Sequence, residues 1–196
     1  MSKESIVGIV VLAAGESKRL GRPKQLLPYL DTTIIAHVVR TALASKVGKT
    51  IVVTGAYADR IRDELDCFPA TIIENHSWQE GVATSIQLGI ETLEQSDMPL
   101  RAVLLMTSDQ LRVSTPLINR IIDKYDNQPN RIVACEYEET IGVPALFDQA
   151  YFPELKSLRG DRGAKSIINS HLDCVVTVAF PDGGLDIDTA RDMEML

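Results

Sequence analysis

The chain has 196 residues, of which 45% are hydrophobic, so it can bury roughly 70% of its unfolded surface around one core. Lys and Arg total 20 against 27 Asp and Glu, and the formal net charge of −7 argues against a general nucleic-acid binder, which needs a basic face. The sequence has no apolar run near the roughly 18 residues of a membrane span, and its start, MSKES, lacks a signal peptide's apolar core. We therefore expect a single cytoplasmic domain over residues 1–196, with no nucleic-acid or membrane partner.

Apolar strand-like runs alternate with helical patterns along the chain. In chain order, strands are expected at residues 6–12, 50–54, 71–73, 102–106, 132–135 and 174–180, with an additional strand or extended loop at 141–147. Helices are expected at residues 35–43, around 61–65, and at 82–93, 114–125, 162–170 and from Thr189 onward. Such alternation is typical of an α/β protein, and we predict a Rossmann-like, doubly wound domain with a mostly parallel β-sheet.

The strongest chemical signal is the segment at residues 6–24, IVGIVVLAAGESKRLGRPK, where an apolar strand runs into a loop of small residues and cations. Its small residues, 13–15, let backbone N–H groups approach an anion, and Lys18, Arg19 and Lys24 can neutralise a triphosphate. Open α/β sheets bind ligands beyond the carboxyl ends of their strands, so we expect phosphate binding here. A tight surface turn with solvated charges is the alternative interpretation.

The spacing in this loop differs from that of two better known phosphate loops. A Walker A loop has four residues between its glycines, with Lys and then Ser or Thr directly afterwards. Here five residues separate Gly15 from Gly21, and Lys24 is followed by Gln25. The dinucleotide fingerprint needs a glycine at the third position, where this chain has Ser17. The loop therefore belongs to neither type.

Acidic residues follow two other segments and are candidate metal ligands. Asp109 comes after the apolar strand AVLLM, and a carboxylate there could hold Mg²⁺ together with phosphate oxygens. A turn cap is the alternative for Asp109. Near the end of the sequence, Asp186 and Asp188 have strand-like spacing and point to one side. Asp188 could supply a second metal ligand or cap a helix that starts at Thr189.

The segment LAAGESKRLGRPK resembles the signature loop of the MobA-like nucleotidyltransferase family, most closely that of the molybdenum cofactor cytidylyltransferases. Further segments similar to family elements follow in family order: W-x-x-G-x-x-x-S at 78–85, G-D-x-P at 108–111, G-H-P-x-L-F at 142–147, G-D-x-G-A-R at 160–165 and D-I-D-T at 186–189. The chain departs from these patterns at Ser108, Leu111 and Val143, where the family has Gly, Pro and His. Loss of that His removes one possible donor to the accepting substrate.

The resemblance implies a fold like that of the nucleotide-diphospho-sugar transferases and transfer of CMP from CTP to the terminal phosphate of molybdopterin, with release of pyrophosphate. It also implies Mg²⁺ as cofactor and a molybdenum hydroxylase as a possible recipient of the product. The implied site residues are Lys24 and Arg19 for catalysis; Leu12, Ala13, Ala14, Gly15, Lys24, Gly81 and Ser85 for the nucleotide; Asp109 and Asp188 for the metal; and Gly142, Pro144, Arg162 and Gly163 for the acceptor.

Several alternatives remain open from the residues alone. GTP could replace CTP, although LAAG where guanylyltransferases tend to read LAGG favours cytidine. The acceptor could be another small phosphate, or the chain could be a nucleotide-binding chaperone that carries a finished cofactor. Gly81 or Thr84 could simply start a helix, and Asp161 could be the N-cap of a helix that begins at Arg162.

Overall fold

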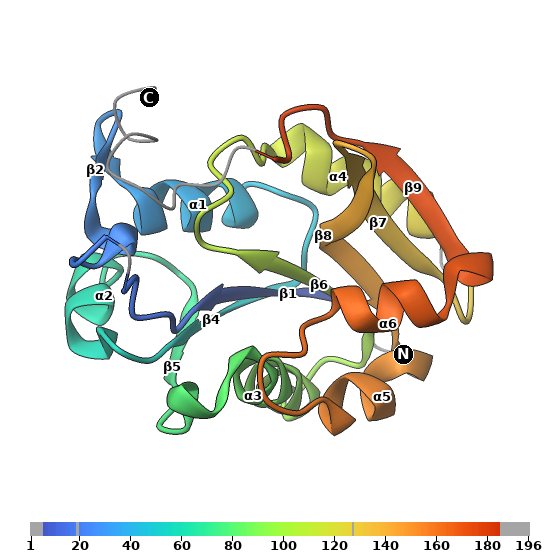
Figure 1. The fold of residues 1–196 in the computed structure, drawn as a ribbon, viewed down its shortest axis with the longest axis horizontal. Coiled ribbons are helices and arrows are strands. Elements are labelled where there is room, and N and C mark those ends of the chain that lie inside the picture. The colour runs from blue at the N-terminus through green and yellow to red at the C-terminus, as the bar shows by residue number, and fades with distance from the viewer. Residues whose placement is uncertain (1–5, 19, 127, 185–196) are drawn as a thin grey trace.

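The computed structural model describes residues 6–18, 20–126 and 128–184, and a seven-stranded β-sheet forms its centre (Figure 1). The strands are β1 (Ile6–Ala13), β4 (Lys49–Thr54), β5 (Thr71–Glu74), β6 (Leu100–Thr107), β7 (Ile132–Tyr137), β8 (Thr140–Asp148) and β9 (Val175–Ala179), in the spatial order β5-β4-β1-β6-β8-β7-β9. The strand β8 runs antiparallel to both of its neighbours, and the other neighbouring strands are parallel. The prediction of a mostly parallel sheet is therefore confirmed.

Helices cover both faces of the sheet, as expected for a doubly wound arrangement. They are α1 (Ile34–Leu43), α2 (Ala58–Glu64), α3 (Val82–Glu94), α4 (Thr115–Tyr125), α5 (Phe152–Ser157) and α6 (Lys165–Ser170). One apolar core lies between the sheet and the face covered by α1 and α4, and a second lies beneath α3, α5 and α6 (Figure 1). Shorter elements are the 3₁₀ turns η1 (Lys24–Leu26), η2 (Trp78–Glu80), η3 (Gln149–Tyr151) and η4 (Leu172–Cys174), and a hairpin of β2 (Pro28–Tyr29) and β3 (Thr32–Thr33).

Burial and capping explain why these segments fold as they do. Ile9, Val10 and Val11 are fully buried, as a central strand with helices on both faces requires. The N-cap of α1 is Thr33, whose hydroxyl accepts the N–H of Ala36. The N-cap of α4 is Ser114, with a proline in the first turn, as the sequence predicts.

One expected helix start is wrong. The segment 162–170 begins its helix at Lys165, and Ala164 rather than Asp161 occupies the N-cap. The expected helix from Thr189 and the D-I-D-T segment lie outside the described residues. Within the described part of the chain, none of the helices has the length and apolar character needed to span a lipid bilayer.

The sheet register places two loops side by side. Leu12, near the end of β1, pairs with Thr107 at the end of β6. The N–H of Ser108 donates to the carbonyl of Leu12 at 3.1 Å and continues this pairing into the loops. The loop that follows β1 and the loop that carries Asp109 therefore leave the sheet next to each other.

Candidate active site

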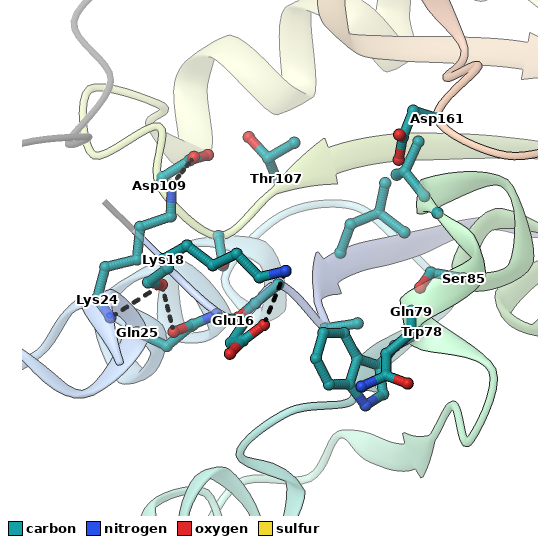
Figure 2. A pocket seen from close by; sticks show the side chains of 17 residues that line it. Glu16, Lys18, Lys24, Gln25, Trp78, Gln79, Ser85, Thr107, Asp109 and Asp161 are labelled. Carbon is teal, nitrogen blue, oxygen red and sulfur yellow. Dashed lines mark hydrogen bonds and ion pairs between the residues drawn. The ribbon is translucent and has the colours of Figure 1, made fainter. Parts of the chain in front are cut away.

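A cavity of about 560 Å³ lies at this carboxyl edge, at the ends of β1 and β6 (Figure 2). Its lining comes from the β1 loop, η1, the segment around η2, the start of α3, the end of β6 and the loop before α6. The lining residues are Leu12, Ala14, Gly15, Glu16, Ser17, Lys18, Lys24, Gln25, Trp78, Gln79, Gly81, Val82, Ser85, Thr107, Ser108, Asp109 and Asp161. Most of the residues expected to bind nucleotide therefore share one cavity.

A buried glutamine shapes the loop after β1. Gln25 is 1% exposed, and its Nε2 donates to the carbonyls of Ala13 at 3.2 Å and Gly15 at 2.9 Å. The Ser17 hydroxyl donates to Gln25 Oε1 at 3.4 Å and accepts the N–H of Lys24 at 3.2 Å. These bonds fold the loop back on η1, so that Lys24 and the loop face the same cavity.

The next carbonyls along the loop also accept hydrogen bonds from other residues of the protein. The N–H of Ala56 donates to the carbonyl of Ala14 at 3.2 Å, and the hydroxyl of Tyr57 donates to that of Glu16 at 3.0 Å. A loop whose carbonyls are already satisfied offers a ligand mainly its N–H groups. This arrangement suits an anion, as the sequence predicts.

An ion pair joins the two chemical elements predicted from sequence. Lys24 Nζ lies 2.5 Å from Asp109 Oδ2, and the two side chains are 16% and 19% exposed (Figure 2). The pair brings η1 and the end of β6 together across a sequence separation of 85 residues. A second lysine, Lys18, also lines the cavity; it is 80% exposed and lies 3.4 Å from Glu16. The cationic end of the cavity is therefore built by Lys24 and Lys18.

Helix α1 contacts the loop that carries Asp109. The ring of His37 hydrogen-bonds to the backbone of Leu111, and Tyr29 contacts the ring edge-on with centroids 4.8 Å apart. Burial, with a smaller contribution from the nearby Arg40 guanidinium, lowers the pKa of His37. A neutral imidazole suits this structural role.

The donor set fits a metal that arrives with a nucleotide. Among the described residues no group of three His, Cys, Asp or Glu side chains is placed to hold a metal ion. Mg²⁺ in nucleotide sites commonly takes one or two carboxylates and completes its shell with substrate phosphates and water. Asp109 supplies one carboxylate to the cavity. The predicted partner ligand Asp188 and the predicted catalytic Arg19 lie outside the described residues.

Gly81 brings two distant motifs into contact at the other end of the cavity. It precedes α3 with φ 107° and ψ 171°, a conformation that essentially only glycine adopts. A Cβ at this position would lie 2.2 Å from the backbone carbon of Gly160. The N–H of Ala83 donates to the Gly160 carbonyl at 3.1 Å. The loop before α6 therefore packs directly on the first turn of α3.

A buried amide orients the hydroxyls of α3. Asn75, 4% exposed, accepts the N–H of Ser77 on Oδ1 at 2.9 Å. Its Nδ2 donates to Thr84 Oγ1 at 2.8 Å and to Ser85 Oγ at 2.9 Å. Thr84 in turn donates to the Gly81 carbonyl at 2.9 Å. Gly81 is the N-cap of α3, as one interpretation held, and Thr84 lies in the first turn of the helix. Ser85 lines the cavity.

The predicted acceptor residues lie apart from the cavity. Gly142, Pro144, Arg162 and Gly163 are not among its lining residues, and neither is the buried Ala13. The acceptor segment is nevertheless tied to the Asp109 loop, because Gln110 Nε2 donates to the Val143 carbonyl at 3.0 Å. An acceptor that contacts this segment would approach the cavity from the β8 side.

Three contributors were missed by sequence reasoning. Gln25 and Asn75 act through buried amides whose partners are backbone and hydroxyl groups. In the sequence, the only sign of such a residue is a polar side chain next to a predicted site. That sign does not show which groups the amide hydrogen-bonds. For Asp161 a helix cap was one open interpretation, and in the structure Asp161 lines the cavity instead.

A mostly parallel sheet with a cation-bearing N–H loop and a carboxylate at its carboxyl edge is typical of nucleotide-binding α/β proteins. The chain belongs to the MobA-like NTP transferase domain family, whose model matches residues 9–175. The predicted family is thereby confirmed.

Individual relatives are distant but cover nearly the whole chain. Nicotine blue oxidoreductase of Paenarthrobacter nicotinovorans is 29% identical over 95% of this chain and 94% of its own. The molybdenum cofactor cytidylyltransferase of Escherichia coli is 24% identical over 96% of this chain and 97% of its own. The crystal structure of Rv0371c from Mycobacterium tuberculosis superposes with a TM-score of 0.86 at 30% identity, covering 100% and 98% of the two chains. A second structure of Rv0371c, in complex with manganese, has a TM-score of 0.80 at 28% identity over 98% of each chain.

Proposed function

We propose that this protein transfers CMP from CTP to the terminal phosphate of a molybdopterin-type acceptor and releases pyrophosphate. The observation that carries this proposal is the contact between Lys24 and Asp109 beside the N–H loop, inside one cavity. The relative that is named as a molybdenum cofactor cytidylyltransferase supports the choice of reaction. The sequence LAAG in the β1 loop supports cytidine over guanosine.

In the proposed step, an oxygen of the acceptor's terminal phosphate forms a bond to the α-phosphorus of CTP. The bond from the α-phosphorus to the oxygen that bridges to the β-phosphate breaks, and this oxygen leaves with pyrophosphate. The acceptor phosphate is already ionised near pH 7, so no general base is needed to generate the nucleophile. The protein then has to position the two anions and stabilise the charge that develops between them.

The described residues divide these tasks. Lys24, which lines the cavity, would neutralise charge on the leaving phosphates, and the N–H groups of residues 14–17 would bind them. Ser85 lies away from Lys24 (Figure 2), and the nucleoside would extend toward it and toward Gly81, which also lines the cavity. Mg²⁺, held by Asp109 and by the predicted ligand Asp188, would supply further neutralisation of phosphate charge. The manganese complex of Rv0371c supports a divalent cation in this family.

The test is pyrophosphate release in the presence of Mg²⁺ with CTP, GTP, ATP and UTP in turn, with and without molybdopterin. We expect release with CTP that depends on the pterin. Release with GTP alone among the nucleotides would keep the reaction class and replace the donor. Nucleotide binding without release from any donor would favour the carrier role and contradict the proposed transfer.

A further inference from the structure

Asp161 is a cavity residue whose carboxylate has no assigned task. It lines the cavity, and it makes no hydrogen bond or ion pair with any residue that the structure describes. The capping role expected for it is excluded because α6 begins at Lys165, with Ala164 at the N-cap. Asp161 is an exposed residue, so water can solvate its carboxylate in the free protein, and a ligand that fills the cavity would take the place of that water.

The backbone on both sides of Asp161 fixes where this carboxylate lies. The carbonyl of Gly160 accepts the N–H of Ala83, and the backbone N of Asp161 lies 2.7 Å from the position of a Cβ on Gly81. Asp161 is therefore held against the first turn of α3. Figure 2 shows Asp161 and Ser85 at the end of the cavity opposite Lys24. At the lysine end the carboxylates of Asp109 and Glu16 are paired with Lys24 and Lys18, whereas the carboxylate of Asp161 has no ion pair with a described residue. Phosphates would therefore be repelled more at the Asp161 end, which favours the triphosphate at the lysine end and the nucleoside at the Asp161 end.

The hydroxyl of Ser85 is set as a donor by its neighbour. The Oδ1 of Asn75 accepts the backbone N–H of Ser77, which is a donor only, so the orientation of the Asn75 amide is fixed. Its Nδ2 then donates to Ser85 Oγ. Because that oxygen already accepts, the hydroxyl hydrogen of Ser85 is directed to another partner. Within the cavity, this partner would be an acceptor on the ligand.

We propose that Asp161 is a specificity-determining residue that accepts a hydrogen bond from the exocyclic amino group of the nucleobase, while Ser85 donates to a ring acceptor of the same base. An ionised carboxylate only accepts hydrogen bonds. Cytosine offers an amino group beside ring acceptors. Uracil has a carbonyl oxygen in place of the amino group, and this oxygen and the carboxylate, both hydrogen-bond acceptors, would repel each other. This inference rests on the proposed function, because it requires that the cavity binds a nucleotide.

Trp78 allows nucleotide binding to be measured directly. It is the one tryptophan of the sequence and lines the cavity, so its fluorescence reports nucleotide binding without any acceptor or turnover. The Kd values of CTP and UTP are measured for the wild type and for Asp161→Asn, which keeps the shape but can both accept and donate. The control is Glu80→Gln, which removes one negative charge from an exposed residue of η2 that does not line the cavity.

We expect the wild type to prefer CTP over UTP and Asp161→Asn to reduce that preference about tenfold, the size expected for a charge-assisted hydrogen bond. Glu80→Gln should keep the wild-type ratio. An unchanged ratio in Asp161→Asn would overturn the assignment of Asp161 and leave the proposed function standing. Equal loss of both nucleotides in Asp161→Asn would place the residue outside base recognition. A wild type that binds no nucleotide would overturn the proposed function itself.

Discussion

Replacement of Gly81 by Ala should separate two motifs that the fold holds in contact. The new Cβ would lie 2.2 Å from the backbone carbon of Gly160, and restoring an ordinary contact of 3.4 Å requires a shift of about 1.2 Å. The neighbour is backbone rather than a flexible side chain, so the loop or the start of α3 must move. In addition, φ 107° with ψ 171° costs a non-glycine residue about 1–3 kcal/mol. With about 1–3 kcal/mol for the overlap, we expect a loss of about 2–6 kcal/mol in unfolding free energy.

Urea unfolding followed by circular dichroism measures this loss, and Trp78 fluorescence measures nucleotide binding in the same samples. Gly163→Ala is the matched control, because a Cβ there would lie 3.6 Å from Val82 Cγ1, an ordinary contact. We expect this control to stay within about 1 kcal/mol of the wild type. If Gly81→Ala and Gly163→Ala lost the same stability, the close approach of Gly81 to Gly160 would not be the cause of the loss.

Three further changes test other parts of the site and core. Lys24→Met should lower kcat about 100-fold while changing the Kd of CTP much less, because the charge it stabilises develops in the transition state; equal effects in single-turnover and binding assays would contradict this. Gln25→Met leaves two loop carbonyls without their donor, so it should lower the unfolding free energy by about 2–4 kcal/mol and weaken nucleotide binding. Urea unfolding and fluorescence titration measure the two effects, and wild-type values in both would contradict the role of Gln25. Tyr125→Phe removes a hydrogen bond to the buried Asp148 and should cost about 1.5–3 kcal/mol at neutral pH. Burial and this bond raise the pKa of Tyr125 above its ordinary value of 10.0. The stabilisation is therefore complete below pH 10 and falls as the pH rises further. If the difference in unfolding free energy between variant and wild type did not shrink on alkaline titration, the linkage would be excluded.

The sequence predicts the sheet well because burial on both faces leaves a strong pattern. Continuous apolar runs such as residues 9–11 and 102–106 form fully buried strands where expected. The pattern does not reveal that β8 is antiparallel, since strand direction depends on the connection rather than on the residues. The short helix α5 was also missed, because six residues carry too little periodicity to stand out.

The sequence predicts only some of the residues that form the cavity. Lys24 and Asp109 were identified because charged residues after buried strands are visible in sequence, and the register of β1 and β6 then brings them together. Gln25 and Asn75 were missed because a buried amide is defined by its partners, which come from other turns of the chain. The capping interpretation of Asp161 rested on local preference, which does not reveal that α6 begins at Lys165, three residues after the expected start at Arg162.

The most direct test of the central claim follows the phosphorus atoms of the nucleotide. The wild-type protein is incubated with Mg²⁺, molybdopterin and CTP labelled at either the α- or the γ-phosphate, and the products are separated. We expect the α-label in a pterin dinucleotide and the γ-label in pyrophosphate, in equal amounts. Retention of the α-label in CTP, by a protein whose Trp78 fluorescence shows that CTP is bound, would contradict nucleotidyl transfer.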